Sequence, residues 1–492
     1  MVNIMISNLL FQAFALLFLS ATHVAASDER SRIFVLTDIS NEPDDQESLV
    51  RLLAHADLYR VEGLVATTSW WLNDTRYPDH ILDVIDGYAD VVDNLNIHSE
   101  HGFPPADYLR SRVAASHELY GIAALERNMS TGAELLVQAV DDSSEPLYVQ
   151  MWGGAVVLAE ALHHVQTTRP AKSLDAFVSK LRAYGISDQD DAGPWIRREF
   201  PALRYIVSIH GFNMYGRAAW VGMSGEDYYY FDAGGPDTSL VSNDYIEKNF
   251  QRGPLGEHYL DPAYIIEGDS PSLLYNIQNG LNAPEHPEYG GWGGRYTATD
   301  LSGASQVYSD VVDYVVGKNN QTFVSNYATI WRWRKAYQNE MTARIGWSLT
   351  SNYSAAAHPP KLVVNESSGY DPLTLSTSPG VTVSLDASKS IDVDTNSSST
   401  LEFQWFHYRE ITLATNPNWL VQRLVPQLNV TCVDENCEHV QVKMPEVDLA
   451  CLADDGSCQS YHIILAATTS AETPLTRYKR IILDLQRNAT MA

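Results

Sequence analysis

The chain has 492 residues, of which 45% are hydrophobic and 19% charged, so it is globular and long enough for two or three domains. Its formal net charge of -28 argues against nucleic acid or an anionic membrane as a partner, because both need a basic surface. The acidity fits a secreted protein, although charge alone does not establish secretion.

The first 26 residues look like a secretory signal peptide. An apolar run of about a dozen residues precedes the small residues Val24, Ala25 and Ala26, so we expect cleavage after Ala26. The run is short for a bilayer span of roughly 20 residues, which makes a membrane anchor the weaker interpretation. The basic residues that usually open a signal peptide are missing.

Between residues 27 and 355 we predict one α/β domain. Short apolar runs alternate with amphipathic stretches, which is typical of a mostly parallel sheet with helices on both faces. Ligands bind such sheets beyond the carboxyl ends of the strands. The expected strands lie within 32–39, 61–69, 146–154, 181–187 and 203–210, and clear helical patterns cover 45–56 and 156–166.

Between residues 356 and 492 the helical periodicity stops and alternating runs separated by turns begin. This pattern predicts an all-β, Ig-like sandwich. The expected strands lie within 381–388, 401–410, 439–445, 460–470 and 477–486.

Cysteines and sequons support an extracellular location. The even, clustered set of cysteines predicts two disulfides, and a zinc site is less favoured because no histidine stands at a suitable spacing. The cysteines are Cys432, Cys437, Cys451 and Cys458. Eight Asn-X-Ser/Thr sequons predict a glycoprotein. They begin at Asn73, Asn128, Asn320, Asn352, Asn365, Asn396, Asn429 and Asn488.

An acidic stretch, "TDISNEPDDQESL", directly follows the first expected strand. Its acids are Asp38, Glu42, Asp44, Asp45 and Glu47. Carboxylates that converge at a sheet rim repel one another unless a cation is present, and several aspartate oxygens suit Ca²⁺ best. The positive end of a helix is the simpler explanation, but it accounts for only one or two acids. We therefore predict a Ca²⁺ site, with Glu47 solvated on the following helix.

The pattern D-x-x-N-E-x-D-D after a strand resembles the aspartate signature of inosine-uridine-type nucleoside hydrolases. Further stretches resemble their secreted nucleoside-hydrolase-like, cellulose-binding relatives. They include "VATTSWWLND", "MWGGAVVLAEAL", "EGDSPSLLYNIQNG" and "QWFHYRE". The resemblance spans nearly the whole mature chain. It implies the nucleoside-hydrolase-like fold and Ca²⁺-dependent hydrolysis of a glycosyl bond.

The resemblance also implies roles for individual residues. Asp38 would bind the metal and activate the attacking water as general base. Asp44 and Asp45 would bind the metal and a sugar hydroxyl, in a loop two residues longer than in the family. Asp269 matches the last metal ligand, and a backbone carbonyl ligand would come from around Val156.

The leaving-group side departs from the family pattern. Inosine-uridine-type enzymes carry a histidine before the last aspartate, whereas this chain has Gly268. An acid would have to come from elsewhere, with His258, Asp261 and His210 as candidates, or the leaving group would not need one. The substrate would then differ from a common nucleoside.

Other polar and aromatic side chains near strand ends are candidates for substrate contact. The full set is Asn41, Glu42, Trp71, Asp190, His210, Asn213, His258, Trp292 and Arg295. Exposed tryptophans stack on sugars, but core packing is the simpler explanation for Trp71 and Trp292. Asp190 could instead begin a helix, and His210 could be structural.

Three functions remain open from the sequence. The first is a secreted Ca²⁺-dependent glycosidase acting on a saccharide, a polysaccharide among the options, or on a nucleoside. The second is a non-catalytic carbohydrate-binding protein. The third is an extracellular interaction protein that uses the β-sandwich for adhesion.

Overall fold

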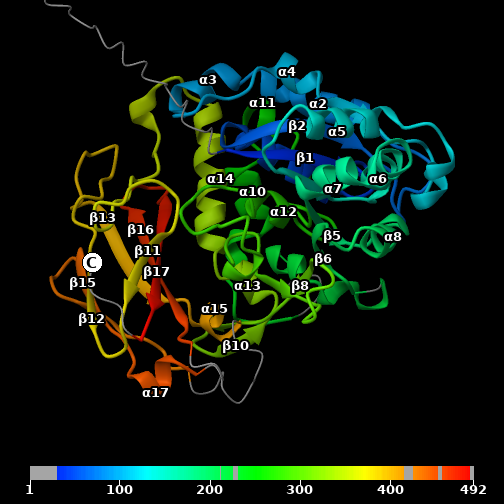
Figure 1. The fold of residues 1–492 in the computed structure, drawn as a ribbon. Coiled ribbons are helices and arrows are strands. Elements are labelled where there is room, and N and C mark those ends of the chain that lie inside the picture. Colours follow the sequence, from blue (N-terminus) through cyan, green and yellow to red (C-terminus); the bar gives the residue numbers. More distant parts are fainter. Residues whose placement is uncertain (1–29, 211, 225–230, 415–424, 453–456, 488–492) are drawn as a thin grey trace, which may run out of the picture.

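The structure is a computed structural model that describes residues 30–210, 212–224, 231–414, 425–452 and 457–487. The predicted signal peptide lies outside these residues. A large sheet flanked by helices forms the N-terminal part, and two smaller sheets form the C-terminal part (Figure 1). Among the described helices, none is long and apolar enough to cross a membrane.

The large sheet has eight strands in the order β3-β2-β1-β4-β5-β6-β8-β7, and only the β7–β8 pair is antiparallel. Its strands are β1 Ser31–Thr37, β2 Tyr59–Ala66, β3 Val113–Ala115, β4 Leu147–Met151, β5 Leu181–Ser187, β6 Arg204–Ser208, β7 Tyr296–Ala298 and β8 Val307–Asp310. The five strands expected from the sequence are all present. A separate hairpin joins β9 Asp313–Val316 to β10 Thr322–Ser325.

Helices cover both faces of this sheet. Alternate side chains of β1 enter different cores: Ile33 and Val35 pack with α1 and α2, whereas Phe34 and Leu36 pack with α5 and α6. This alternation explains why β1 is buried along its whole length. The helices are α1 Pro43–Ala54, α2 Pro78–Ala89, α3 Val92–His98, α4 Ala106–Arg110, α5 Thr131–Asp141, α6 Val156–Thr168, α7 Ala171–Ser179, α8 Ala192–Glu199, α10 Asn243–Asn249, α11 Gly253–Gly256, α12 Ser270–Leu274, α13 Ala328–Trp331 and α14 Arg334–Ser348.

The C-terminal part is a β-sandwich, as predicted. One sheet has the order β11-β17-β16-β13 and the other the order β12-β15-β14, and side chains from both enter one hydrophobic core. The elements are β11 Leu373–Thr377, β12 Thr382–Asp386, β13 Leu401–His407, α15 Arg409–Ala414, β14 Val430–Cys432, β15 His439–Lys443, α17 Val447–Ala450, β16 Ser460–Thr469 and β17 Thr476–Leu485. The two predicted disulfides are present, as Cys432–Cys437 and Cys451–Cys458.

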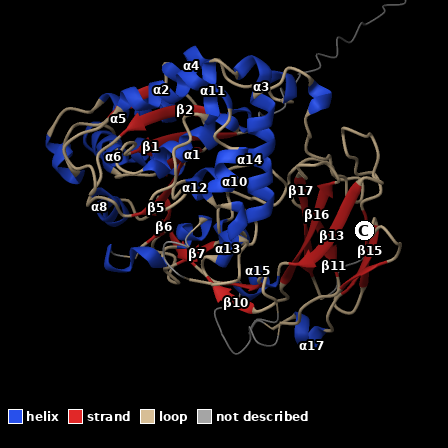
Figure 2. Cartoon of the chain, turned by 180° about the vertical axis from the view of Figure 1, so that it is seen from behind, coloured by secondary structure: helices blue, strands red, loops and turns tan. Residues whose placement is uncertain are grey.

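Helix α14 lies between the large sheet and the β-sandwich (Figure 2). Arg477 of β17 donates hydrogen bonds to both carboxylate oxygens of Glu340 on α14, at 2.8 and 3.0 Å. Arg480 of β17 donates to the carbonyls of Leu281 and Gly290, in the segment after α12. The sandwich is therefore joined to the α/β part by buried polar contacts.

Candidate functional site

The strand order places a ligand site at the carboxyl ends of β1 and β4. β1 lies between β2 and β4. The connection from β1 to β2 runs towards one edge of the sheet, whereas β4 lies on the other side of β1, and a crevice forms at the carboxyl ends of the strands where the order reverses in this way. Asp38 follows β1 directly and is 3% exposed. A Cβ at Gly153, after β4, would lie only 2.8 Å from Asp38 Oδ1, so the glycine allows the backbone after β4 to approach Asp38 closely.

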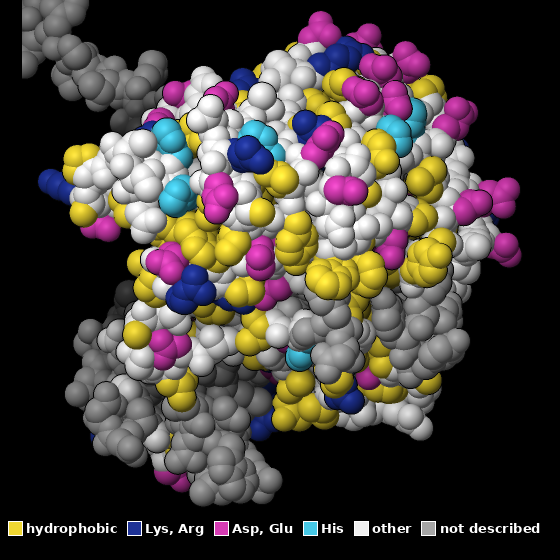
Figure 3. Space-filling model, turned by 90° about the vertical axis from the view of Figure 1, so that its right-hand side faces the viewer, with side chains coloured by type: hydrophobic (Ala, Val, Ile, Leu, Met, Phe, Trp, Pro, Cys, Tyr) yellow, Lys and Arg dark blue, Asp and Glu magenta, His cyan; other side chains and the backbone are white. Residues whose placement is uncertain are grey.

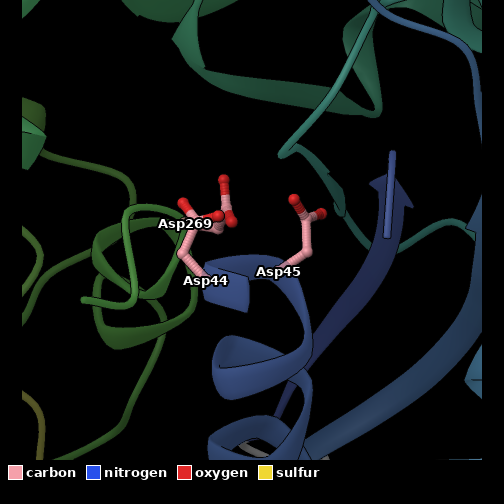
Figure 4. A group of neighbouring side chains, drawn as sticks. All are labelled: Asp44, Asp45 and Asp269. Carbon is pink, nitrogen blue, oxygen red and sulfur yellow. The ribbon is translucent and has the colours of Figure 1, made fainter. Parts of the chain in front are cut away.

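Three more carboxylates converge on this rim. Pro43 starts α1, whose first turn carries Asp44 and Asp45, and Asp269 immediately precedes α12. One carboxylate oxygen from each of these aspartates lies within 4.8 Å of the others. Their carboxylates point into a shared space (Figure 4). The structure therefore brings these distant segments together, and the role of the three aspartates as metal ligands stays a prediction.

The carboxylates strongly perturb one another. Burial raises the pKa of Asp38 to about 6, and burial together with the charges of Glu42 and Asp38 raises the pKa of Asp44 to about 7. Burial and neighbouring carboxylates raise the pKa of Asp45 and Asp269 well above the ordinary range. Without a positive charge, the site disfavours its own ionised form.

The donor set fits a hard divalent cation. Asp269 Oδ2 is buried and has no hydrogen-bond partner, which leaves its lone pairs aimed at the cluster. Within the described part of the chain, no lysine, arginine or histidine forms an ion pair with Asp38, Asp44, Asp45 or Asp269. Buried carboxylate oxygens of this kind are ligands for Ca²⁺ or Mg²⁺.

A buried polar network holds Asp269 in place. Glu267 has a positive φ of 46°, which is costly for a residue with a side chain. Its carboxylate accepts hydrogen bonds from Arg51 Nη2 at 2.8 Å, from the Tyr259 hydroxyl at 2.7 Å and from the Ser270 hydroxyl at 2.6 Å. The prediction that Glu47 is solvated is wrong: it is fully buried and accepts the Glu267 N–H at 2.9 Å. A charged pair such as Arg51 and Glu267, distant in sequence, gives no local signal.

The hydroxyls of Ser69 and Thr37, which were not predicted from the sequence, orient Asp38 and Asp45. The Ser69 hydroxyl, after β2, donates to Asp38 Oδ2 at 2.5 Å and accepts the N–H of Trp71 at 3.1 Å. The Thr37 hydroxyl, at the end of β1, donates to Asp45 Oδ1. Both are threonine or serine at a strand end, which is the one signal that could have pointed to them.

A tryptophan fills the space at Gly268. A Cβ there would lie 2.7 Å from Asp44 Oδ2 and 3.0 Å from the Trp220 ring. Trp220 is 1% exposed and donates from Nε1 to the Ser187 hydroxyl at 3.0 Å. No side chain fits at position 268, so the histidine of the inosine-uridine pattern has no room in this chain.

Asn41 and Glu42 belong to the lengthened loop, and the Glu42 carboxylate is close enough to raise the pKa of Asp38, Asp44 and Asp269. Asn41 and Glu42 are half-buried, and neither side chain has a hydrogen bond to another described residue. Burial raises the pKa of Glu42. Val156 is fully buried at the start of α6, three residues after Gly153. Its carbonyl as a metal ligand stays a prediction.

Two proposed substrate contacts, Trp292 and Arg295, are corrected by the structure, whereas Asp190 stays a prediction. Asp190 is buried, its Oδ1 accepts the N–H groups of Ala192 and Gly193 at the start of α8, and its Oδ2 has no hydrogen-bond partner among the described residues. Trp292 is fully buried, and its Nε1 donates to the Tyr478 hydroxyl of β17 at 3.3 Å. Arg295 is 3% exposed, and its Nε donates a hydrogen bond to Asp313 Oδ1 at 2.8 Å.

The candidates for the acid, His210, His258 and Asp261, contact residues other than the four aspartates. His210 follows β6, and its Nε2 lies 3.3 Å from Asp310 Oδ2, which raises the histidine pKa. The His258 ring lies against Gly87 of α2. Asp261 is exposed and accepts a hydrogen bond from Gln251 at 2.9 Å. The Asn213 side chain is outside the described part. Trp71 is 48% exposed, so it is not a core residue, and its contact with a substrate stays a prediction.

Comparisons with known proteins extend these observations. The family model "Cellulose-binding Sde182, nucleoside hydrolase-like domain" matches residues 32–296, and "Cellulose-binding protein Sde0182, C-terminal domain" matches residues 382–485. A solved nucleoside hydrolase-related hypothetical protein from Saccharophagus degradans, associated with carbohydrate metabolism, is 30% identical. It covers 93% of this chain and 100% of its own, with a TM-score of 0.73.

A second solved structure is more distant. The inosine-uridine preferring nucleoside hydrolase from Bacillus anthracis is 12% identical and covers 64% of this chain and 99% of its own, with a TM-score of 0.35. No curated protein matches the chain.

Proposed function

The chain belongs to the family of cellulose-binding, nucleoside-hydrolase-like proteins, and on that premise we propose that it is a secreted, Ca²⁺-dependent hydrolase of N-glycosyl or O-glycosyl bonds in a saccharide. The observation that carries the proposal is the meeting of four buried aspartates at the rim of the sheet, one of them with an unpaired oxygen. The cellulose named in the family description makes a saccharide the first substrate class to test.

Asp38, Asp44, Asp45 and Asp269 would hold the cation, with the Val156 carbonyl as a further proposed ligand. A bound Ca²⁺ would offset the repulsion among these carboxylates and make a water at the site more acidic. The raised pKa values of the aspartates fit a site whose charge is balanced only when a cation is present.

Asp38 would act as the general base. The Ser69 hydroxyl occupies Oδ2, so Oδ1 is the oxygen left to accept a proton from water. A carboxylate that already accepts one hydrogen bond in a fixed direction is oriented for this transfer.

Asn41 and Glu42 would position sugar hydroxyls, because both are polar, half-buried and available above the cluster. The water oxygen bonds to the anomeric carbon as the glycosyl bond breaks, and nearby carboxylates stabilise the positive charge that develops on the sugar. No acid side chain fits at Gly268, so the leaving group takes its proton from solvent. Leaving groups that tolerate this route are favoured.

The first test is Asp38→Asn. Turnover, followed as reducing ends or free base released, should fall by at least about 100-fold, which is the usual share of a general base. Asparagine keeps the size of the side chain, so the melting temperature should change little. Asp79→Asn is the matched control, because Asp79 is an exposed acid in the first turn of α2. Unchanged turnover in Asp38→Asn would refute the assignment.

Binding without turnover is the second candidate function. The observation that favours it is Trp220, which occupies the place where an acid would stand beside the cluster. A protein of this kind would bind Ca²⁺ and saccharide in the parent form and release no product from any glycoside tested.

A further inference from the structure

Exposed aromatic side chains cluster at the loop that bonds to Asp38. Trp70 is 53% exposed and Trp71 is 48% exposed, although tryptophan is usually well buried. Hydrophobic side chains also gather in a belt across one face of the molecule (Figure 3). The two tryptophans need an explanation that core packing does not give.

The loop that carries them is held firmly. The Trp70 N–H donates to the Gln189 carbonyl at 2.5 Å, and the N–H groups of Trp71 and Leu72 donate to the Ser69 hydroxyl at 3.1 Å. That same hydroxyl donates to Asp38. The backbone that carries the two rings is therefore held at a set position relative to the proposed general base.

An aromatic wall runs from Trp71 to the carboxylates. The Trp71 ring lies 6.5 Å from the Tyr215 ring, and Tyr215 lies 4.9 Å from Trp220, both edge to face. Trp220 in turn reaches Gly268 beside Asp44. Trp70 makes a separate pair with Tyr120, with ring centres 6.2 Å apart. Both tryptophans therefore belong to aromatic pairs, and the series that begins at Trp71 reaches the acidic cluster.

Tyr264 is another exposed aromatic residue, and its backbone is strained. Tyr264 is 68% exposed and has a positive φ of 68°, which costs free energy for an aromatic residue. The next residue, Ile265, packs in the same small core as Trp220. A strained backbone that presents a large ring to solvent is typical of a binding surface.

From these contacts we infer that the site takes an extended saccharide chain, whose successive sugar rings stack on Trp71 and Trp70 on either side of the bond held at the carboxylates. Pyranose rings with apolar C–H faces suit such flat aromatic surfaces. A single nucleoside would leave the outer rings unused. The inference rests on the proposed function and names the substrate class of the same site.

The test measures affinity against chain length. β-1,4-linked gluco-oligosaccharides of two to six units, and free ribonucleosides, are titrated by calorimetry with Ca²⁺ present, after enzymatic removal of N-glycans because the Asn73 sequon stands two residues from Trp71. The inactive Asp38→Asn background keeps the ligands intact. Affinity should rise with chain length, and Trp71→Ala and Trp70→Ala should each weaken binding of the six-unit chain about tenfold.

Matched variants separate stacking from damage to the fold. Trp71→Phe should restore part of the affinity, and Tyr314→Ala, which removes a 52% exposed ring on β9, should leave it unchanged. Ca²⁺ should bind to each tryptophan or tyrosine variant as tightly as to the Asp38→Asn background in which the variant is made. Affinity that is independent of chain length, tighter binding of ribonucleosides, or six-unit binding unchanged by both tryptophan variants would overturn the inference. Failure of the proposed function is a different result, turnover unchanged by Asp38→Asn.

Discussion

At the scale of single residues, Gly268 determines what the acidic cluster can contain. Its lack of a side chain lets Asp44 and Trp220 approach from two directions. Small residues at such positions are easily read as loop features, yet here the glycine allows an indole ring to close one side of a charged site. The tryptophan thereby replaces a polar group that the family resemblance leads one to expect.

Gly268→Ala should therefore disturb the site without removing any ligand. The new Cβ would meet Asp44 Oδ2 at 2.7 Å and the Trp220 ring at 3.0 Å, so one of them must move. Overpacking of this kind costs about 1–3 kcal/mol of unfolding free energy. Urea unfolding measures that loss, and calorimetry should show weaker Ca²⁺ binding, because Asp44 is displaced.

Gly346→Ala is the matched control. Gly346 lies in the last turn of α14, and a Cβ there would meet no atom within 4 Å. Alanine is favoured over glycine in a helix by roughly 0.5–1 kcal/mol, so this variant should be slightly more stable. A loss of stability in Gly346→Ala equal to that in Gly268→Ala would contradict the steric explanation.

The residue scale also shows why part of the site was predictable. Asp38, Asp44 and Asp45 follow a buried strand and open a helix, so their neighbours in sequence reveal their position. Trp292 was misread because "GGWGG" resembles an exposed loop. Its glycines instead admit close packing, since a Cβ at Gly293 would clash with the backbone of Tyr275. Long-range packing of that kind has no local signature.

At the scale of elements, strands buried on both sides were the most predictable. β1, β2, β4, β5 and β6 carry continuous apolar runs, which follow from helices covering both faces of a parallel sheet. β7 to β10 were missed because they are three or four residues long and mostly half-exposed or exposed. Their pairing depends on partners elsewhere in the fold rather than on their own pattern.

Strand β13 carries a histidine that should make the sandwich sensitive to acid. The N–H of Leu428 donates to His407 Nδ1 at 3.1 Å, which requires an unprotonated nitrogen, and burial lowers the His407 pKa to about 3. The unfolded chain binds this proton near pH 6.5, whereas the folded chain does not. Stability should therefore fall as the pH drops below about 6.5, by up to about 1.4 kcal/mol per pH unit for this group.

His407→Asn tests that slope. Asparagine offers an acceptor oxygen near the Nδ1 position and does not titrate, so the variant should lose less stability than the parent between pH 7 and pH 5. Urea unfolding at the two pH values gives the difference, with exposed His101→Asn as the control that should behave like the parent. Equal slopes in the parent and His407→Asn would show that the His407 proton is not coupled to folding.

At the scale of the whole molecule, the α/β part and the sandwich share one interface rather than a flexible joint. Trp292 contacts Tyr478 of β17, and His98 of α3 stacks on His358, which in turn bonds Asp394. These contacts come from segments far apart in sequence, so the sequence predicted the two parts but not the interface between them.

The asparagines of the seven sequons in the described part of the chain are all exposed.

The Glu340 carboxylate is the electrostatic centre of that interface. It is 1% exposed and lies between Arg344 of α14 and Arg477 of β17, whose charges lower its pKa far below the usual range despite its burial. Glu340→Gln would leave two buried guanidinium groups facing a neutral amide. Removing one partner of a buried charge network typically costs about 3–5 kcal/mol. Because the carboxylate contacts both the α/β part and the sandwich, the loss of stability should appear in both.

Urea unfolding of Glu340→Gln, followed by tryptophan fluorescence and by hydrogen exchange in β17 and in β1, should show one transition shifted to lower urea. Asp141→Asn, which removes an exposed pair with Arg169 at a similar 2.7 Å, should change stability by less than about 1 kcal/mol. Two separate transitions, with only the sandwich destabilised in Glu340→Gln, would mean that the interface does not couple the folding of the two parts.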